Sequence, residues 1–379
     1  MREGMIRFPG HIQNSLVFRR AVVVLLLAVF VLSVPQVAHA DSTLDPIWGA
    51  PTDFAPYWLV MYKDPARIYT IYQLPFLAGH LIAQGLVKGA NPCVFNGVQE
   101  NGYADLCGLQ FASEVSVSWQ NRFDDKIISV SQATGIPPIL LKNVFVLESQ
   151  TWPQTTVSTS YEYGLGHMTL YGADALLRWN QSYYQTLCEA NIPLDRCKLA
   201  YVQQPDYVQS MLRGLVIKQV NADCSNCRES VDLSIAENSI PVFANTLIAH
   251  ANLVKFYIKE YTGSDADAAA SYEDLWSFAL ASYNAGPGCF QNALIRTVYG
   301  GMALTWANLS LQLDPACDHA FAYVGLIKMT DSYQYVLSSP PGGLVNQAAN
   351  GAASDSTRNS LISDSRLDSA IQDQRVSYR

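Results

Sequence analysis

Apolar residues recur at steps of three and four along much of this chain, the spacing that buries one face of a helix. The clearest case is 111–135, FASEVSVSWQNRFDDKIISVSQATG, which ends in a glycine, as helices often do. The segment Ile136-Pro137-Pro138 then precedes ILLKNVFVLES. Because proline is tolerated in the first turn of a helix, the pattern predicts a new helix here, with Glu148 about three turns into a mostly apolar segment.

Further helical patterns follow in the second half of the chain. They are YVQSMLRGLVIKQV (207–220), PVFANTLIAHANLVKFYIKEY (241–261) and a stretch over 271–299 that Ala285-Gly286-Pro287-Gly288 interrupts. Residues 41–110 are instead rich in turn-forming residues and predict an irregular N-terminal segment, in which only 74–87 has the character of a helix. No strand set is indicated beyond short pieces in that segment. The predicted fold is therefore mainly α.

The two ends of the chain differ in composition from its middle. Residues 1–40 combine four arginines, the apolar run AVVVLLLAVFVLSV and the sequence Ala38-His39-Ala40, which together predict a cleaved signal peptide and an exported protein. The apolar run is shorter than the ~20 residues that span a bilayer, so no membrane span is expected after cleavage. Residues 338–379 are small, polar and poor in aromatics, and predict a disordered tail.

The charge of the chain excludes one class of partner. Without residues 1–40 the protein has 20 basic and 31 acidic side chains, a net charge of −11. Affinity for nucleic acids depends on cations that face phosphates, so no nucleic-acid partner is expected. The chain is also rich in tyrosine, with 21 residues, and a ring with an apolar face and a polar tip suits contacts with carbohydrate.

All eight cysteines follow the predicted cleavage site. An even number in an exported chain predicts disulfides, although eight cysteines allow 105 pairings. Neighbour pairing favours Cys93 with Cys107 and Cys289 with Cys317. Residues Cys188, Cys197, Cys224 and Cys227 form either disulfides, the preferred interpretation, or a four-thiolate zinc site. No other metal-ligand spacing and no phosphate-binding loop is visible, so neither a metal nor a cofactor is expected.

Three motifs in this order carry the functional interpretation: GIPPILLKNVFVLESQTWP (135–153), YGLGHMT (163–169) and FALASYNAGPG (278–288). Together they resemble the catalytic domain of the soluble lytic transglycosylases, which have a lysozyme-like helical fold and cleave peptidoglycan. The resemblance spans about 111–337, with a cysteine-bearing insertion near 185–245. It departs from the family at His167, where glutamine is usual, and at Gly166, where methionine is frequent.

Glu148 is the candidate catalytic residue on two grounds. Cleavage of a glycosidic bond needs an acid to protonate the leaving oxygen, and apolar neighbours such as Val144, Phe145 and Leu147 favour the protonated form of a carboxyl. The resemblance implies the same role. It also implies that the substrate's 2-acetamido group replaces a second carboxylate, and that Glu148 then acts as base on the sugar 6-hydroxyl, which leaves a 1,6-anhydromuramic end.

Two alternatives remain open. Glu162 or Asp174 could supply a second carboxylate and activate water, which would make the protein a hydrolysing muramidase. The chain could also be a non-catalytic cell-wall binding module that keeps the fold. In either case the expected partner is a peptidoglycan glycan strand, the expected location is the periplasm or the outside of the cell, and the expected state is a monomer.

The resemblance also implies a set of substrate-binding residues around Glu148. Asn284 would contact the N-acetyl sugar or order the site, and Tyr323 would place its hydroxyl near Glu148. The full set is Ser149, Gly164, Leu165, His167, Met168, Tyr283, Asn284, Ala285, Gly286 and Tyr323. His250, in the middle of a predicted helix, is expected to be packed in the core.

Overall fold

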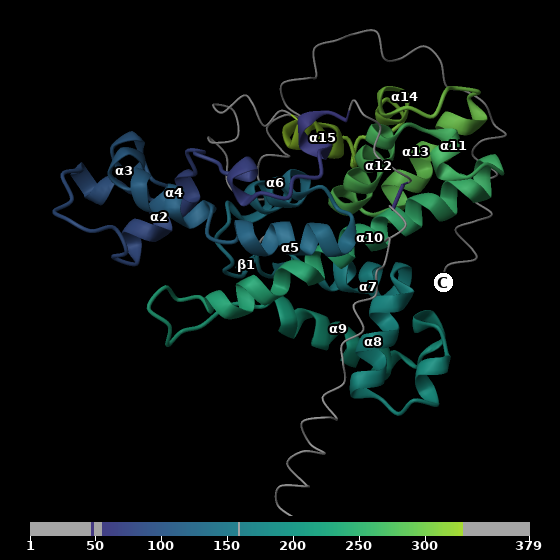
Figure 1. Ribbon diagram of the computed structural model, residues 1–379, viewed down its shortest axis with the longest axis horizontal. Helices are drawn as coiled ribbons and strands as arrows, with labels where there is room; N and C mark the ends of the chain where they lie inside the picture. Colours follow the sequence, from purple (N-terminus) through teal and green to yellow (C-terminus); the bar gives the residue numbers. More distant parts are fainter. Residues whose placement is uncertain (1–46, 49–54, 158–159, 329–379) are drawn as a thin grey trace, which may run out of the picture. The chain divides into compact units, whose positions relative to one another are not determined.

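The computed structural model describes residues 47–48, 55–157 and 160–328 (Figure 1). The predicted signal peptide (1–40) and the predicted disordered tail (338–379) lie outside the described residues. Within them the protein is mainly helical, as predicted, and no helix is both long enough and apolar enough to cross a membrane. The short 3-10 helices are η1 (Tyr57–Leu59), η2 (Pro65–Ile68), η3 (Val94–Gly97), η4 (Arg196–Lys198) and η5 (Tyr201–Gln203).

The α-helices carry most of the described chain. They are α2 (Pro75–Ala83), α3 (Leu106–Phe111), α4 (Ser113–Gln120), α5 (Asp124–Thr134), α6 (Pro138–Ser149), α7 (Leu170–Trp179), α8 (Gln181–Asn191), α9 (Asp206–Val220), α10 (Leu233–Thr262), α11 (Ala266–Ala269), α12 (Tyr272–Ala285), α13 (Pro287–Tyr299), α14 (Trp306–Ser310) and α15 (His319–Lys328).

Helix α6 follows the sequence signals closely. Pro138 is its first residue, and Gly135, just before it, ends α5 in the left-handed conformation with φ 75°. All twelve residues of α6 except Glu148 are buried. A helix that is apolar on every side is surrounded by other elements, and α6 packs against η1, α5 and α15.

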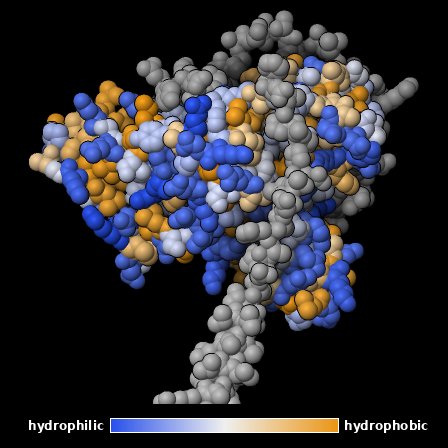
Figure 2. Space-filling model, viewed as in Figure 1, coloured by the Kyte–Doolittle hydropathy of each residue, from blue (hydrophilic) through white to orange (hydrophobic). Residues whose placement is uncertain are grey.

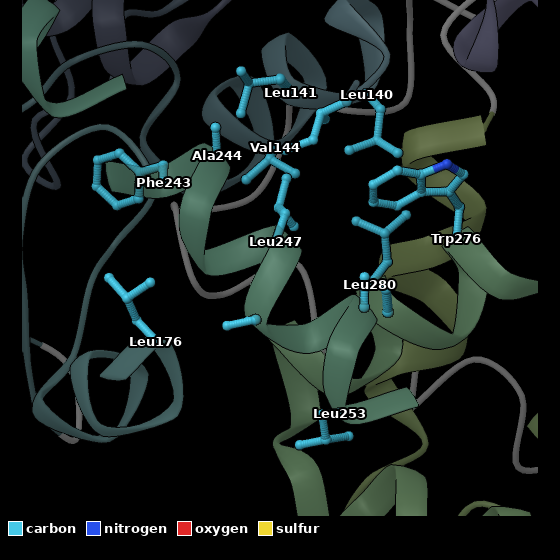
Figure 3. Packing of buried hydrophobic residues seen from close by; sticks show 14 of the residues in the cluster. Leu140, Leu141, Val144, Leu176, Phe243, Ala244, Leu247, Leu253, Trp276 and Leu280 are labelled. Atoms are coloured by element: carbon cyan, nitrogen blue, oxygen red, sulfur yellow. The ribbon is translucent and has the colours of Figure 1, made fainter. Parts of the chain in front are cut away.

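The main core forms where α6, α7 and α12 meet the long helix α10. Leu140 and Val144 of α6 approach Leu247 of α10, and Leu280 of α12 closes the group from the other side (Figure 3). Every one of these four side chains is almost completely inaccessible to solvent. Burying a leucine or valine side chain contributes about 1.5–3 kcal/mol each, so this layer fixes α6 firmly in the molecule.

Helix α10 is longer than its sequence pattern indicated. Pro241 marked the start of the predicted stretch, but the helix begins at Leu233, where Asp232 accepts hydrogen bonds from the backbone of Ser234 and Ile235. Pro241 therefore lies inside the helix. Strong capping by Asp232, nine residues earlier, and burial on one side of the intervening turns outweigh the hydrogen bond that proline cannot donate. The first turns of α10 thus lie within the predicted insertion, 185–245.

The two-stranded sheet was not predicted at its observed place. Strands β1 (Thr156–Val157) and β2 (Tyr161–Glu162) pair antiparallel, immediately before YGLGHMT, whereas strand pieces were expected only in the N-terminal segment. Strands of two residues are too short to give an alternating pattern. This hairpin positions Glu162.

All eight cysteines are paired. The disulfides are Cys93–Cys107, Cys188–Cys197, Cys224–Cys227 and Cys289–Cys317. The neighbour pairing predicted for the first and last is confirmed, and the middle four form disulfides as preferred over a zinc site. The described residues contain no group of three or more His, Cys, Asp or Glu side chains that could hold a metal ion.

The N-terminal segment is attached to α6 by polar contacts as well as by packing. The Lys142 ammonium group, 1% exposed, donates to the Ile68 carbonyl, the Asn121 amide oxygen and the Asp124 carboxylate, each at 2.7 Å. The side-chain oxygen of Gln150 accepts a hydrogen bond of 2.8 Å from the backbone of Phe76, in the first turn of α2. Apolar side chains remain exposed on the part of the surface that carries α2 to α4 (Figure 2), among them Phe95 and Leu106.

Candidate active site

Glu148 lies at the end of α6 with its carboxylate held from two sides. The Tyr323 hydroxyl, from α15, donates a hydrogen bond of 2.7 Å to Oε1 of Glu148. On the other side Oε2 lies 3.6 Å from Nδ1 of His167. The Glu148 side chain is 13% exposed, so the carboxylate is largely enclosed by protein but still reachable from solvent.

The backbone around Glu148 is strained. Six non-glycine residues of the described chain have positive φ, and three of them flank this carboxylate: Gln150 (49°), Thr151 (63°) and His167 (48°). Such conformations cost of order 1–3 kcal/mol each and cluster at functional sites. Burial of all three residues and the bond from Gln150 to α2 compensate for the cost here.

The YGLGHMT stretch forms a tight turn that presents His167 to Glu148. Tyr163 and Met168 exchange two backbone hydrogen bonds of 3.0 and 2.9 Å. Gly164 has φ 71°, and a Cβ atom there would lie 2.3 Å from the Val220 carbonyl oxygen. A Cβ atom on Gly166 would lie 2.5 Å from the Phe243 ring. The two glycines therefore let the turn pack directly against α9 and α10.

The third motif meets the second at the same place. The Tyr283 hydroxyl, from α12, donates a 2.6 Å hydrogen bond to the Gly166 carbonyl. Asn284 follows it, and its buried Oδ1 has no hydrogen-bond partner among the described residues. Gly286 then ends the helix with φ 91° next to the half-buried Ala285. Asn284 thus offers an unused acceptor in the residue that follows Tyr283.

Three of the predicted binding residues use their side chains inside the protein. The Ser149 hydroxyl is fully buried and donates to the Leu165 carbonyl at 2.8 Å, so it ties α6 to the turn. The side chains of Leu165 and Met168 are packed in the main core. These residues support the site through packing, and their side chains offer no surface to a sugar in this structure.

The two candidate second carboxylates have different surroundings. Oε2 of Glu162 lies 3.6 Å from the same His167 nitrogen that faces Glu148, and it accepts a 3.3 Å hydrogen bond from Thr156. Asp174 instead forms an ion pair of 3.0 Å with Arg213 and accepts a short hydrogen bond from Tyr201. The sequence offered no signal for Thr156, because its contact depends on the unpredicted hairpin.

The two tyrosines next to the site remain hydrogen-bond donors over a wide pH range. Burial raises the pKa of Tyr323 well above its ordinary value, and the nearby Glu148 charge adds to the effect. Burial and the same charge act in the same direction on the pKa of Tyr283. His250, by contrast, is fully enclosed, its Nδ1 lies 2.8 Å from the Ser282 hydroxyl, and burial lowers its pKa to about 3, so it is a core residue as predicted.

Comparisons with known proteins add no assignment. No family model, no curated protein and no solved structure matches this chain. The functional interpretation therefore depends on the three motifs and on the geometry that they form around Glu148.

Proposed function

We propose that this protein is a peptidoglycan lytic transglycosylase with a lysozyme-like fold. It cleaves the β-1,4 bond between N-acetylmuramic acid and N-acetylglucosamine and leaves a 1,6-anhydromuramic end. It acts outside the cytoplasm as a monomer on glycan strands, without a metal or an organic cofactor. One observation supports this most strongly: Glu148 accepts a hydrogen bond from the Tyr323 hydroxyl and lies beside His167 of the second motif. The third motif joins the same place through the bond from Tyr283 to Gly166.

Glu148 has the surroundings that the reaction needs. As an acid it would protonate the leaving glycosidic oxygen. The resulting carboxylate would be stabilised by the Tyr323 hydrogen bond, which strengthens when its acceptor becomes charged. Glu148 would then accept the proton of the muramic 6-hydroxyl as that oxygen attacks C1, so the proton count of the enzyme is restored after each turnover.

A hydrolysing muramidase is the second candidate, and one observation favours Glu162 as its base. Both carboxylates lie 3.6 Å from one His167 nitrogen, so their nearest oxygens are no more than about 7 Å apart. Glycosidases place their two catalytic carboxyl groups roughly 5–5.5 Å apart in retaining enzymes and roughly 6.5–9.5 Å apart in inverting ones, so Glu162 is close enough to Glu148 for this role. Asp174 is less suited to this role because Arg213 and Tyr201 already occupy its oxygens.

Digestion of purified peptidoglycan distinguishes these candidates. Anhydro ends, lighter by one water in the mass spectrum of the muropeptides, support the transglycosylase. Reducing ends of full mass would support the muramidase, and retained wall binding without any product would leave the binding module. Glu148→Gln should lower the rate by at least about a hundredfold, the lower range for loss of a general acid. Glu114→Gln, an exposed carboxyl in the first turn of α4, is the matched control.

A further inference from the structure

The buried Nδ1 of His167 faces two carboxylates and makes no hydrogen bond with the described residues. Its side chain is 3% exposed, and Nδ1 is buried with no hydrogen-bond partner. That nitrogen nevertheless lies 3.6 Å from a carboxylate oxygen of Glu148 and 3.6 Å from one of Glu162. Both distances exceed those of ordinary hydrogen bonds. A buried polar atom with no partner between two carboxylates calls for an explanation.

The other ring nitrogen restricts the possible proton positions. Nε2 of His167 lies 3.5 Å from the Thr156 hydroxyl oxygen. Thr156 has a single hydroxyl proton, which it donates to Oε2 of Glu162. We therefore assign the Thr156 oxygen as the acceptor for His167 and place a proton on Nε2.

It follows that Nδ1 is protonated or faces a protonated carboxyl. A neutral ring with its proton on Nε2 would direct a lone pair at two oxygens, and two carboxylates this close repel each other. One additional proton relieves both repulsions, on Nδ1 or on one of the carboxyls. Two neighbouring phenols keep their own protons: Tyr323 donates to Glu148, Tyr283 donates to Gly166, and burial keeps both neutral.

We propose that Glu148, His167 and Glu162 share one proton, and that His167 is the positioning residue through which Glu162 controls the protonation of Glu148. In one form His167 is cationic between two carboxylates. In the other, Nδ1 has passed its proton to Glu148, which is then ready to protonate a leaving oxygen. This inference rests on the proposed function for its catalytic meaning, whereas the shared proton is a property of the protein alone.

The shared proton can be tested without substrate. In the full-length protein, ¹⁵N NMR of the histidine rings follows the titration of His167 in the wild type, Glu148→Gln and Glu162→Gln. Each substitution removes one anion beside the ring, so the ring should give up its proton at a lower pH than in the wild type. Asp174→Asn, a carboxyl paired with Arg213, should leave the titration unchanged. Identical titrations in the wild type and both Gln variants would overturn the proposal.

The catalytic consequence has a separate test. His167→Gln keeps a hydrogen-bonding side chain, as the resembled family has there, but cannot take up a proton. The variant should cleave peptidoglycan, and the pH above which its activity falls should be lower than in the wild type. An unchanged pH profile would refute the role of His167 while the proposed cleavage stands. If the wild type does not cleave peptidoglycan, the proposed function fails, and the NMR titration still decides on the shared proton.

Discussion

Replacement of Tyr323 by phenylalanine tests whether Glu148 becomes charged during the reaction. The change removes one hydroxyl from a 5% exposed residue and keeps its ring, so packing is preserved. The lost contact is the 2.7 Å hydrogen bond to Oε1 of Glu148. A hydrogen bond to a charged group contributes about 1.5–3 kcal/mol and a neutral one about 0.5–1.5 kcal/mol. The bond should therefore be about 1–2 kcal/mol stronger after Glu148 has given up its proton.

Only this difference accelerates the chemical step, because a contact of equal strength before and during the reaction does not change kcat. With 1.36 kcal/mol per factor of ten, Tyr323→Phe should lower kcat about five- to thirtyfold, with little change in KM. The assay is the initial rate of muropeptide release from purified peptidoglycan.

The matched control is Tyr184→Phe. Tyr184 is fully buried and donates a hydrogen bond of the same length, 2.7 Å, to the Leu199 carbonyl, which carries no charge. This variant should lose stability and keep its activity. Equal losses of kcat in the two variants would mean that the Tyr323 hydroxyl acts only on stability, and the charge argument for Glu148 would be wrong.

Two further predictions concern stability and are checked by urea denaturation. Lys142→Met should lower the free energy of unfolding by about 3–5 kcal/mol, because it leaves the buried Asp124 carboxylate without its partner. The control is Lys259→Met, which breaks an exposed ion pair with Asp265 and should cost less than about 1 kcal/mol. Equal losses in the two variants would mean that burial does not strengthen the Lys142 pair. Burial lowers the pKa of His250 to about 3 from 6.5, so the stability that its neutral form contributes is present above pH 6.5 and is lost as pH falls towards 3. His250 should contribute a slope of about 1.4 kcal/mol per pH unit, and the total slope should fall by that amount in His250→Gln. An unchanged slope in that variant would assign it to other groups such as His80, whose pKa burial lowers to about 4.

The helices were predictable because their signals are local. Pro138 and Gly135 mark the boundary between α5 and α6, and the apolar steps between them and Glu148 indicate burial. The interior position of Pro241 was not predictable, because the caps and packing that overcome a proline come from residues distant in sequence. Lys142 gave no indication that its ammonium group would be buried among three acceptors, one in η2, one in the residue after α4 and one in α5.

The sequence indicated which residues form the candidate site, but not how their side chains lie relative to one another. The three motifs identified Glu148, His167 and Tyr283, and the resemblance placed the Tyr323 hydroxyl near Glu148, where it lies. Glu162 was predicted only as one of two alternative second carboxylates, with nothing in the sequence to prefer it over Asp174. Its position beside His167 depends on the hairpin of two-residue strands, which leaves no periodic pattern.

The bond between Gln150 and the first turn of α2 has a consequence for the order in which the chain folds. Phe76 and Gln150 are 74 residues apart, and so are Ile68 and Lys142. Synthesis proceeds from the N-terminus. Ile68 and Phe76 therefore cannot form these hydrogen bonds until the residues of α6 and Gln150 have been synthesised. The N-terminal segment is thus completed by α6, which carries Glu148, and by Gln150, the residue that follows it. A chain that ends before residue 150 would lack the contact between Gln150 and α2.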